Sequence, residues 1–312
     1  MKNIYLFPGQ GSQAVGMGKD LYETYGDVKK LFDDANAILN IDIKKYCFEG
    51  PIEELTRTDI VQPAITLVNM AVFIALKARG CLPAVACGHS LGEYAALYAA
   101  GVFSAETVLG LVRLRGTYMQ ECAERNPGGM IAVIGLPIDG VRAVCAQAGE
   151  AGVIGVANFN TKEQIILSGV SGAVAKATEI IEAQGTGRVI PLKVSGPWHS
   201  PLMREAQDRM AAEIAKAHLN DPLIPVICNV TADYGRTAPQ IRENLIAQIT
   251  GSVRWFETVA RLLSDHADAR YAEVGPGRVL KGLMKNINRA VQVQNIENAA
   301  SVDAASGAFA AS

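Results

Sequence analysis

The chain has no excess of charge of either sign and no metal-binding or disulfide pattern. Its 312 residues carry 29 basic and 31 acidic side chains, for a formal net charge of −2. This balance provides no strong field to attract phosphates and argues against a nucleic-acid partner. The six cysteines include no Cys-x-x-Cys pair and do not cluster with the four histidines. We therefore expect reduced cysteines, several of them in the core, and no metal site.

Long apolar runs are also scarce. They are interrupted by charge, Gly or Pro before the roughly 20 residues that a membrane-spanning helix needs. The N-terminal run ends at Pro8, which is too early for a signal peptide. We expect a cytoplasmic globular protein that acts as a monomer, without a membrane partner, and that is long enough to bury a large core.

A Gly-x-Ser-x-Gly pentapeptide at 88–92 is the strongest chemical signal in the chain. An apolar run at 84–87 predicts a buried strand before it, and helix-forming residues follow at 93–100. A serine on such a sharp turn exposes its hydroxyl beside helix N-terminal amides, and the close backbone requires flanking glycines. We interpret Ser90 as a nucleophile. The alternative is an ordinary Gly/Ser turn between a strand and a helix.

Strands and helices alternate along the chain, which predicts an α/β fold with a largely parallel sheet. Among the expected helices are those at 18–37, 62–79 and 200–217. Gln62-Pro63 is expected to open the second of these, because a proline in the first turn loses no hydrogen bond. Ser104 is expected to cap a helix that carries Arg115.

Two Pro/Gly breakpoints, at 126–129 and 195–197, enclose a segment with the order β-α-β-β-α-β, which is typical of a ferredoxin-like unit. We therefore expect a large α/β-hydrolase-like domain with a parallel sheet, formed by residues 1–127 and 196–298. A small ferredoxin-like inserted domain would occupy 128–195. The Ala/Ser-rich residues 299–312 are expected to form a flexible tail.

A serine hydroxyl needs a base to take its proton, and His199 is the best candidate by elimination. His89 adjoins Ser90, but adjacent side chains diverge on such a turn, and His218 and His266 lie in polar segments. The alternative for His199 is a helix cap. No acidic residue stands in an obvious position to orient it, and a backbone carbonyl or an amide side chain can do so without charge.

The first loop, at 9–14, permits two interpretations. Its Gly-x-Gly pattern follows a strand and formally fits a dinucleotide-binding fingerprint, but no acidic residue ends a second strand about 20 residues later. The same loop can instead supply a backbone N–H to an oxyanion hole. We favour the oxyanion interpretation.

Together these motifs resemble the malonyl-CoA:acyl-carrier-protein transacylase family, which includes the acyltransferase domains of polyketide synthases. The resemblance spans nearly the whole chain. It rests on segments in the family's order, at 7–13, 62–64, 88–93, 115–116, 158–160, 196–200 and 273–277.

The resemblance implies a role for each candidate residue. Ser90 would be acylated and His199 would be its base, while Arg115 would grip the free carboxylate of a malonyl group through its two-pronged guanidinium. The remaining roles are the oxyanion-hole amides of Gln10 and Leu91, the carbonyl near Gln248 that orients the histidine, and Asn160 in the cleft. Without the resemblance, Arg115 would be a solvated charge and the two glutamines ordinary polar residues.

The implied reaction is a two-step transfer for fatty-acid or polyketide synthesis. Malonyl would pass from malonyl-CoA to Ser90 and then to the phosphopantetheine thiol of an acyl carrier protein. No cofactor is implied, since the coenzyme A thioester is the substrate.

Two further expectations concern selectivity and docking. Trp198 and Leu91 should leave little room beside the substrate's α-carbon, which favours malonyl over methylmalonyl; the alternative is that Trp198 only packs a domain seam. Four cations recur at helical spacing and would form one face that docks an acidic carrier protein or coenzyme A phosphates: Arg278, Lys281, Lys285 and Arg289. The alternative is a solvated face.

Three other functions compete with acyl transfer. A serine esterase or acyl-thioester hydrolase of the same fold would not need a buried cation such as Arg115. A dinucleotide-binding protein would use residues 9–14 and leave Ser90 and His199 without roles. An inactive scaffold would not need Ser90, His199 and Arg115 together.

Overall fold

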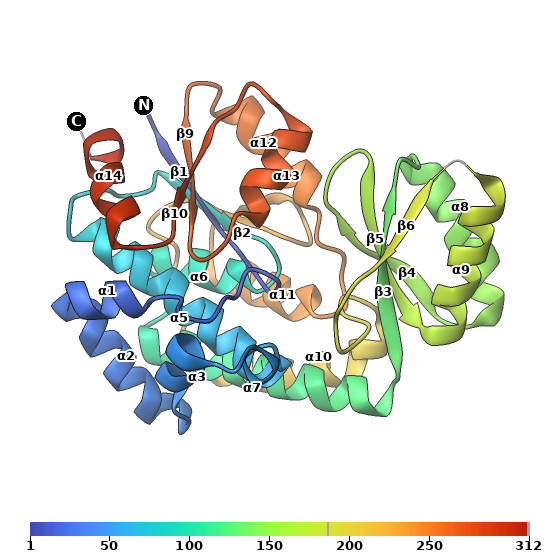
Figure 1. Ribbon diagram of the computed structural model, residues 1–312, viewed down its shortest axis with the longest axis horizontal. Helices are drawn as coiled ribbons and strands as arrows, with labels where there is room; N and C mark the ends of the chain where they lie inside the picture. Colours follow the sequence, from blue (N-terminus) through green and yellow to red (C-terminus); the bar gives the residue numbers. More distant parts are fainter. Residues whose placement is uncertain (186, 311–312) are drawn as a thin grey trace.

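The computed structural model describes residues 1–185 and 187–310, which form two β-sheets with helices packed against them (Figure 1). The larger sheet has six strands in the order β10-β9-β1-β2-β7-β8. Its first five strands are parallel, and β8 is antiparallel to β7. The strands are β1 (Asn3–Phe7), β2 (Val85–Gly88), β7 (Val226–Cys228), β8 (Asp233–Gly235), β9 (Arg270–Val274) and β10 (Val293–Ile296).

Alternate residues of β1 face two different hydrophobic layers. Tyr5 and Phe7 belong to the larger core, whereas Ile4 and Leu6 belong to a smaller one on the other face. The larger core is built with α1 (Lys19–Thr24), α2 (Gly26–Leu39), α3 (Ile43–Glu49), α5 (Thr58–Lys77), α6 (Gly92–Ala99), α7 (Ala105–Arg125), α10 (Arg204–Lys216) and α11 (Ala238–Gln248). The smaller core is built with α12 (Trp255–Asp265) and α13 (Val279–Ile287).

The chain also has three short helical segments, and two expected helix boundaries need correction. The short segments are α4 (Ile52–Leu55) and the 3₁₀ turns η1 (Gly149–Ala151) and η2 (Pro201–Met203). The helix expected at 200–217 therefore consists of η2 followed by α10. The helix expected at 18–37 is two helices, α1 and α2, separated by the extended residue Tyr25.

The prediction that Pro63 opens a helix is wrong, because α5 begins at Thr58 and Pro63 lies inside it. Proline has no N–H to donate to the carbonyl of Asp59 four residues earlier. Arg113 on α7 donates to this carbonyl at 2.5 Å instead. A neighbouring helix thus provides the hydrogen bond that Pro63 cannot make.

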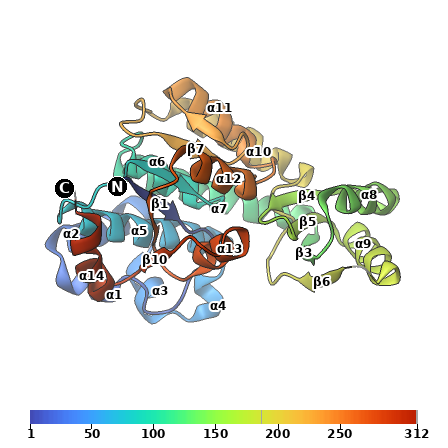
Figure 2. The ribbon, with the colours of Figure 1, turned by 90° about the horizontal axis from the view of Figure 1, so that it is seen from above.

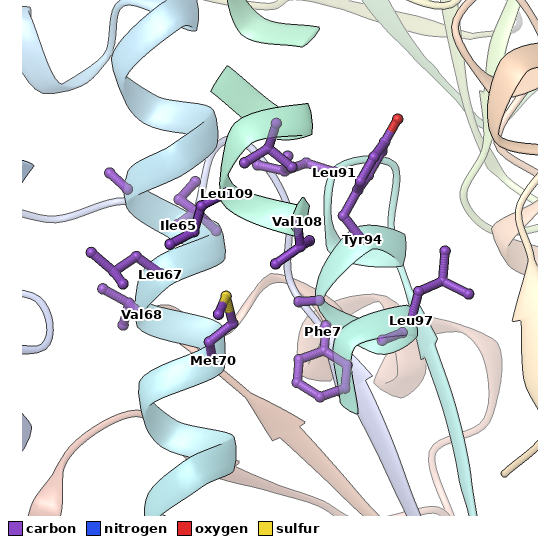
Figure 3. Packing of buried hydrophobic residues seen from close by; sticks show 14 of the residues in the cluster. Phe7, Ile65, Leu67, Val68, Met70, Leu91, Tyr94, Leu97, Val108 and Leu109 are labelled. Atoms are coloured by element: carbon purple, nitrogen blue, oxygen red, sulfur yellow. The ribbon is translucent and has the colours of Figure 1, made fainter. Parts of the chain in front are cut away.

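Helix α5 is also long and apolar enough to cross a membrane by length and composition, contrary to our expectation from the sequence. In the structure 89% of its most apolar window is buried within the protein. Figure 3 shows Ile65 and Met70 of α5 packed with Val108 and Leu109 of α7. Its apolar character is therefore accounted for by its place in the core.

The smaller sheet is antiparallel, with the order β4-β5-β3-β6. Its elements follow in the order β3 (Gly128–Ile134), α8 (Ile138–Ala148), β4 (Ile154–Phe159), β5 (Gln164–Val170), α9 (Ser171–Gln184) and β6 (Arg188–Pro191). Ile131 and Val133 face α8 and α9, which cover the outer side of this sheet (Figures 1 and 2). Met130 and Ala132 alternate with them and face the larger part of the molecule.

Backbone hydrogen bonds fix the smaller sheet against the loop before α12. Phe159 donates to Val253 at 2.9 Å, and Val253 donates to Ala157 at 2.8 Å. These bonds form a parallel bridge between β4 and a segment of the larger unit. The free face of the smaller sheet is thereby held over the carboxyl ends of β1 and β2.

The prediction of a flexible tail is wrong for residues 299–310, and residues 311–312 lie outside the described part. Residues Ala299–Phe309 form α14, which Asn298 caps through Ser301. Phe309 is buried near the ring of Tyr5, and its carbonyl accepts from Asn3 at 2.7 Å. Val302 and Phe309 lie on the same buried face of this helix. The many alanines and serines around them hide that apolar pattern in the sequence.

Candidate active site

Ser90 lies on the turn between β2 and α6, with a backbone φ of +50°. A non-glycine residue rarely adopts this region, and such strain is concentrated at functional sites. A Cβ at position 92 would lie 2.0 Å from the carbonyl oxygen of Phe7, which excludes any residue but glycine. Below the turn, Leu91 and Tyr94 pack into the core (Figure 3). Strain and packing together fix the direction of the serine hydroxyl.

His199 reaches Ser90 across 109 residues of sequence, with its Nε2 2.7 Å from Ser90 Oγ. Its Nδ1 lies 2.9 Å from the carbonyl oxygen of Gln248 and 3.1 Å from that of Gly251. Both carbonyls accept, so Nδ1 carries the proton and the Nε2 lone pair faces the serine. His199 also has a positive φ, of +55°. Among the described residues no carboxylate contacts this imidazole, and two carbonyls occupy the place of a triad acid.

The imidazole of His199 is held in its neutral form. Burial lowers the pKa of His199 to about 3, and the positive charge of Arg115 adds to this effect. A neutral imidazole can accept the proton of Ser90.

Arg115 is buried beside the same serine, with 1% of its surface exposed. Its Nη2 donates to Ser90 Oγ at 3.3 Å and to Gln248 Oε1 at 3.1 Å, and its Nη1 donates to Gln62 Oε1 at 2.8 Å. These acceptors are neutral, and no ion pair of Arg115 is found among the described residues. Burial accordingly lowers the pKa of Arg115. A desolvated cation without an anionic contact favours an anionic ligand.

A cavity of about 450 Å³ opens onto Ser90, His199 and Arg115. On one side the cavity is lined by the loop after β1 and by Val279, Leu280 and Leu283 of α13. On the other side it is lined by Met130, Ala132 and Ile166 of the smaller sheet. The reacting groups thus lie between the two sheets, in a cavity whose lining is mostly apolar.

Gln10 and Leu91 both line this cavity. The loops that carry them meet because β1 and β2 are parallel neighbours, whose carboxyl ends lie at one edge of the sheet. A Cβ on Gly9 would lie 2.4 Å from the carbonyl oxygen of His89. Within the described chain, neither Gln10 nor Leu91 uses its backbone N–H in a hydrogen bond. Gly9, Gln10 and Gly11 of the glycine-rich loop therefore line the same cavity as Ser90.

Asn160, Trp198 and His89 occupy the cavity wall. Asn160 Oδ1 lies 2.9 Å from His89 Nε2, and the His89 ring packs on Trp255. The His89 imidazole therefore bonds Asn160, whereas the Ser90 hydroxyl contacts His199 and Arg115, as expected. Trp198 lines the cavity and lies so close to Gly196 that a Cβ there would be 2.6 Å from its ring. It both shapes the cavity and packs the junction between the two units.

The four expected docking cations do not all lie on one helix. Helix α13 spans only Val279–Ile287, so it carries Lys281 and Lys285, while Arg278 is its N-cap and Arg289 follows its end. All four side chains are exposed, and Arg278 pairs with Glu297 at 3.5 Å. The expectation of a four-residue helical stripe is wrong in this respect, because the helix stops before Arg289.

The structure adds three residues to the site that the sequence did not assign. Gln62 holds Arg115, and Gly251 provides the second carbonyl to His199. Asn229 accepts from the backbone N of Ser90 at 2.6 Å and donates to the carbonyl of Gly88 at 2.7 Å. Gln62 lies in a segment quoted for the resemblance, whereas nothing local distinguishes Gly251 or Asn229.

An α/β fold with a strained Ser–His pair and a buried arginine defines the class of acyl-transferring serine enzymes. Residues 4–305 match the family described as "Acyl transferase domain". The chain is 38% identical over 305 residues to the malonyl CoA-acyl carrier protein transacylase of Bacillus subtilis, covering 97% of this chain and 96% of that protein. It is 39% identical over 284 residues to the Escherichia coli protein of the same name, covering 91% and 92% of the two chains.

Solved structures show the same relationship. The malonyl-CoA:acyl carrier protein transacylase of Xanthomonas oryzae superposes with a TM-score of 0.95 at 38% identity, with 99% of each chain covered. A structure described as a type II polyketide synthase acyl-carrier protein in complex with its malonyl-transacylase gives a TM-score of 0.94 at 34% identity, covering 99% of this chain and 100% of that one. The chain therefore belongs to the malonyl-CoA:acyl-carrier-protein transacylase family.

The electrostatic environment of His199 predicts an unusual titration. From pH 8 to pH 5 the imidazole should stay neutral in the free protein, because its pKa lies near 3. Arg115→Gln removes the neighbouring cation and should raise this pKa, although burial still keeps it below the ordinary value of about 6.5. Ring ¹⁵N shifts measured against pH test both statements, with the amide spectrum reporting that the fold is intact. A wild-type midpoint near pH 6.5 would contradict the first, and identical titrations would contradict the second.

Proposed function

We propose that this protein transfers a malonyl group from malonyl-CoA to the phosphopantetheine thiol of an acyl carrier protein. The observation that carries this proposal is the buried Arg115 guanidinium, 3.3 Å from the Oγ of a serine that also contacts a neutral histidine. The transfer would serve fatty-acid or polyketide synthesis, and a polyketide biosynthesis protein of Burkholderia thailandensis is among the relatives, at 40% identity over 286 residues.

In the first step, His199 Nε2 takes the proton of Ser90 while Oγ attacks the thioester carbon. The backbone N–H groups of Gln10 and Leu91 would donate hydrogen bonds to the carbonyl oxygen as negative charge develops on it. The C–S bond then breaks, the coenzyme A sulfur takes the proton back from His199, and a malonyl ester remains on Ser90.

The second step repeats this chemistry with a different thiol. The carrier's phosphopantetheine S–H gives its proton to His199, and the sulfur attacks the ester carbon. When the C–O bond breaks, Ser90 Oγ recovers that proton. The carbonyls of Gln248 and Gly251 orient the imidazole in both steps and stabilise its transient charge.

Arg115 would select the acyl group by its carboxylate. Its short distance to Ser90 suits a ligand in which one methylene separates the carboxylate from the reacting carbonyl, as in malonyl. The same ion pair would hold the ester in place while water is excluded. A thioesterase of the same fold is the alternative, and the arginine argues against one that acts on uncharged acyl groups.

Several finer points belong to this proposal. The large unit, at 1–127 and 196–298, would be an α/β-hydrolase-like domain, and 128–195 a ferredoxin-like insertion; the order and antiparallel pairing of the smaller sheet support the latter. The protein would act as a cytoplasmic monomer. Coenzyme A enters as part of the substrate, without a bound cofactor or metal.

Intact-protein mass spectrometry tests the function. Malonyl-CoA should leave a malonyl adduct that Ser90→Ala abolishes, and acetyl-CoA should leave little adduct. Arg115→Gln should reduce the malonyl preference by roughly a hundredfold, since it removes a buried charge pair. Adding a holo acyl carrier protein should move the group to the carrier. Release of free malonate in place of transfer would favour the hydrolase.

Trp198 is proposed to restrict the space beside the substrate's α-carbon, because it lines the cavity near Ser90. In Trp198→Ala, methylmalonyl transfer should rise relative to malonyl transfer by roughly tenfold, the value of one methylene in an apolar pocket. Competition between the two thioesters measures this ratio, and Trp198→Phe is the control that retains a ring. An unchanged ratio in Trp198→Ala would show that the ring only packs the junction.

Arg278, Lys281, Lys285 and Arg289 are proposed to dock the acidic carrier protein, because they are exposed on and beside α13, whose other residues line the cavity. Replacing Lys281 and Lys285 together with Glu should raise the KM for carrier protein several-fold at low salt. The same reversal at Lys19 and Lys77, which are exposed and do not line the cavity, is the control. Equal KM values for the two double variants would remove the docking role.

A further inference from the structure

Glu93 is a buried carboxylate that the transfer steps leave unused. It lies in the first turn of α6, three residues after Ser90, and none of its surface is exposed. Burial raises the pKa of Glu93 to about 7, although its hydrogen bonds and the charge of Arg115 oppose this. Burying a carboxylate costs free energy unless polar partners compensate for the lost water. The partners of Glu93 therefore indicate which groups it keeps in place.

The carboxylate accepts hydrogen bonds from Gln248 and Asn229, and each of these residues supports a different part of the site. Oε2 of Glu93 accepts from Gln248 Nε2 at 2.6 Å and from the backbone N of Asn229 at 3.2 Å. Asn229 in turn binds the backbone on both sides of His89, through the N of Ser90 and the carbonyl of Gly88. Glu93 thus anchors the backbone of the residue whose side chain holds the turn.

Gln248 connects Glu93 to the other reacting groups. Its Oε1 accepts from Arg115, its Nε2 also donates to the carbonyl of Ser90 at 3.0 Å, and its backbone carbonyl accepts from His199. Oε2 of Glu93 already accepts from the backbone N of Asn229 and so faces Gln248 as an acceptor, which requires the NH₂ end of the amide. The carbonyl end must then face Arg115. With the amide reversed, NH₂ would oppose the guanidinium, donor against donor.

We propose that Glu93 is a positioning residue, which acts through Gln248 to aim Arg115 at the substrate carboxylate and through Asn229 to fix the Ser90 turn. This inference rests on the proposed malonyl transfer. The consequence is specific: loss of Glu93 should slow transfer of malonyl more than transfer of an acyl group without a carboxylate, because only malonyl has a carboxylate for Arg115 to bind.

The test is the ratio of kcat/KM values for acylation of Ser90 by malonyl-CoA and by acetyl-CoA. Glu93→Gln retains the shape but can present its NH₂ to Gln248, which frees that amide to turn. The malonyl-to-acetyl ratio should fall about tenfold. A purely structural role would lower both rates together and leave the ratio unchanged.

Asp59→Asn is the matched control. It makes the same carboxylate-to-amide change next to α7, where Asp59 pairs with Arg113 at 3.1 Å, two residues from Arg115 in sequence. Its ratio should stay within twofold of the wild type, since Arg113 does not line the cavity.

Near-ultraviolet circular dichroism establishes which variants fold. If Glu93→Gln does not, Gln248→Met is the second variant, because it breaks the link to Arg115 and keeps the backbone carbonyl that orients His199. It should show the same fall in the ratio. The proposal for Glu93 is overturned if folded Glu93→Gln has a malonyl-to-acetyl ratio within twofold of the wild type. If Glu93→Gln does not fold, the same result for folded Gln248→Met overturns it. A wild-type protein without a malonyl adduct on Ser90 overturns the proposed function instead.

Discussion

The buried positive charge of Arg115 is the constraint on which the rest of the site depends. Burying a guanidinium requires that its donors find acceptors, and Gln62, Gln248 and Ser90 supply neutral ones. Burial lowers the pKa of His199, the charge of Arg115 adds to this effect, and together they keep the base neutral. One residue therefore influences both recognition of an anionic acyl group and the protonation state of the base.

Two backbone carbonyls take the place of a triad acid at His199. A third group has to orient the imidazole and stabilise the cation that forms during transfer. Here the carbonyls of Gln248 and Gly251 do this as dipoles. The nearest buried carboxylate, Glu93, contacts Gln248 and Asn229 and not the histidine. The Glu93 carboxyl group thus contacts the Gln248 amide and the Asn229 backbone, whereas two neutral carbonyls face His199.

The two sheets have separate tasks. Parallel pairing of β1 and β2 brings the Gln10 loop to the Ser90 turn, and the smaller sheet closes the cavity from the opposite side. His199 lies just after the chain returns from the smaller unit, so the base and the wall near Trp198 are fixed at the junction. Binding sites are commonly built from loops at the carboxyl edge of a parallel sheet and from residues at the interface between two domains.

The sequence by itself determined what depends on neighbours along the chain. The strand–serine–helix turn, the Ser104 cap and the β-α-β-β-α-β order could be predicted because propensity, capping and periodicity act over a few residues. Elimination among four histidines also selected His199. The same local reasoning missed α14, since its few buried side chains stand among alanines and serines, and it placed Pro63 wrongly at a helix start.

Only the tertiary structure decided which polar groups meet. Arg115 joins Gln62 across 53 positions, and Gln248 joins Ser90 across 158. Whether a charge is buried, and whether its partners are charged, depends on such distant contacts, and a pattern along the chain does not encode them. Arg115 therefore resembles a surface charge in the sequence, whereas the fold places it next to the serine and places Glu93 against Gln248, which accepts from Arg115.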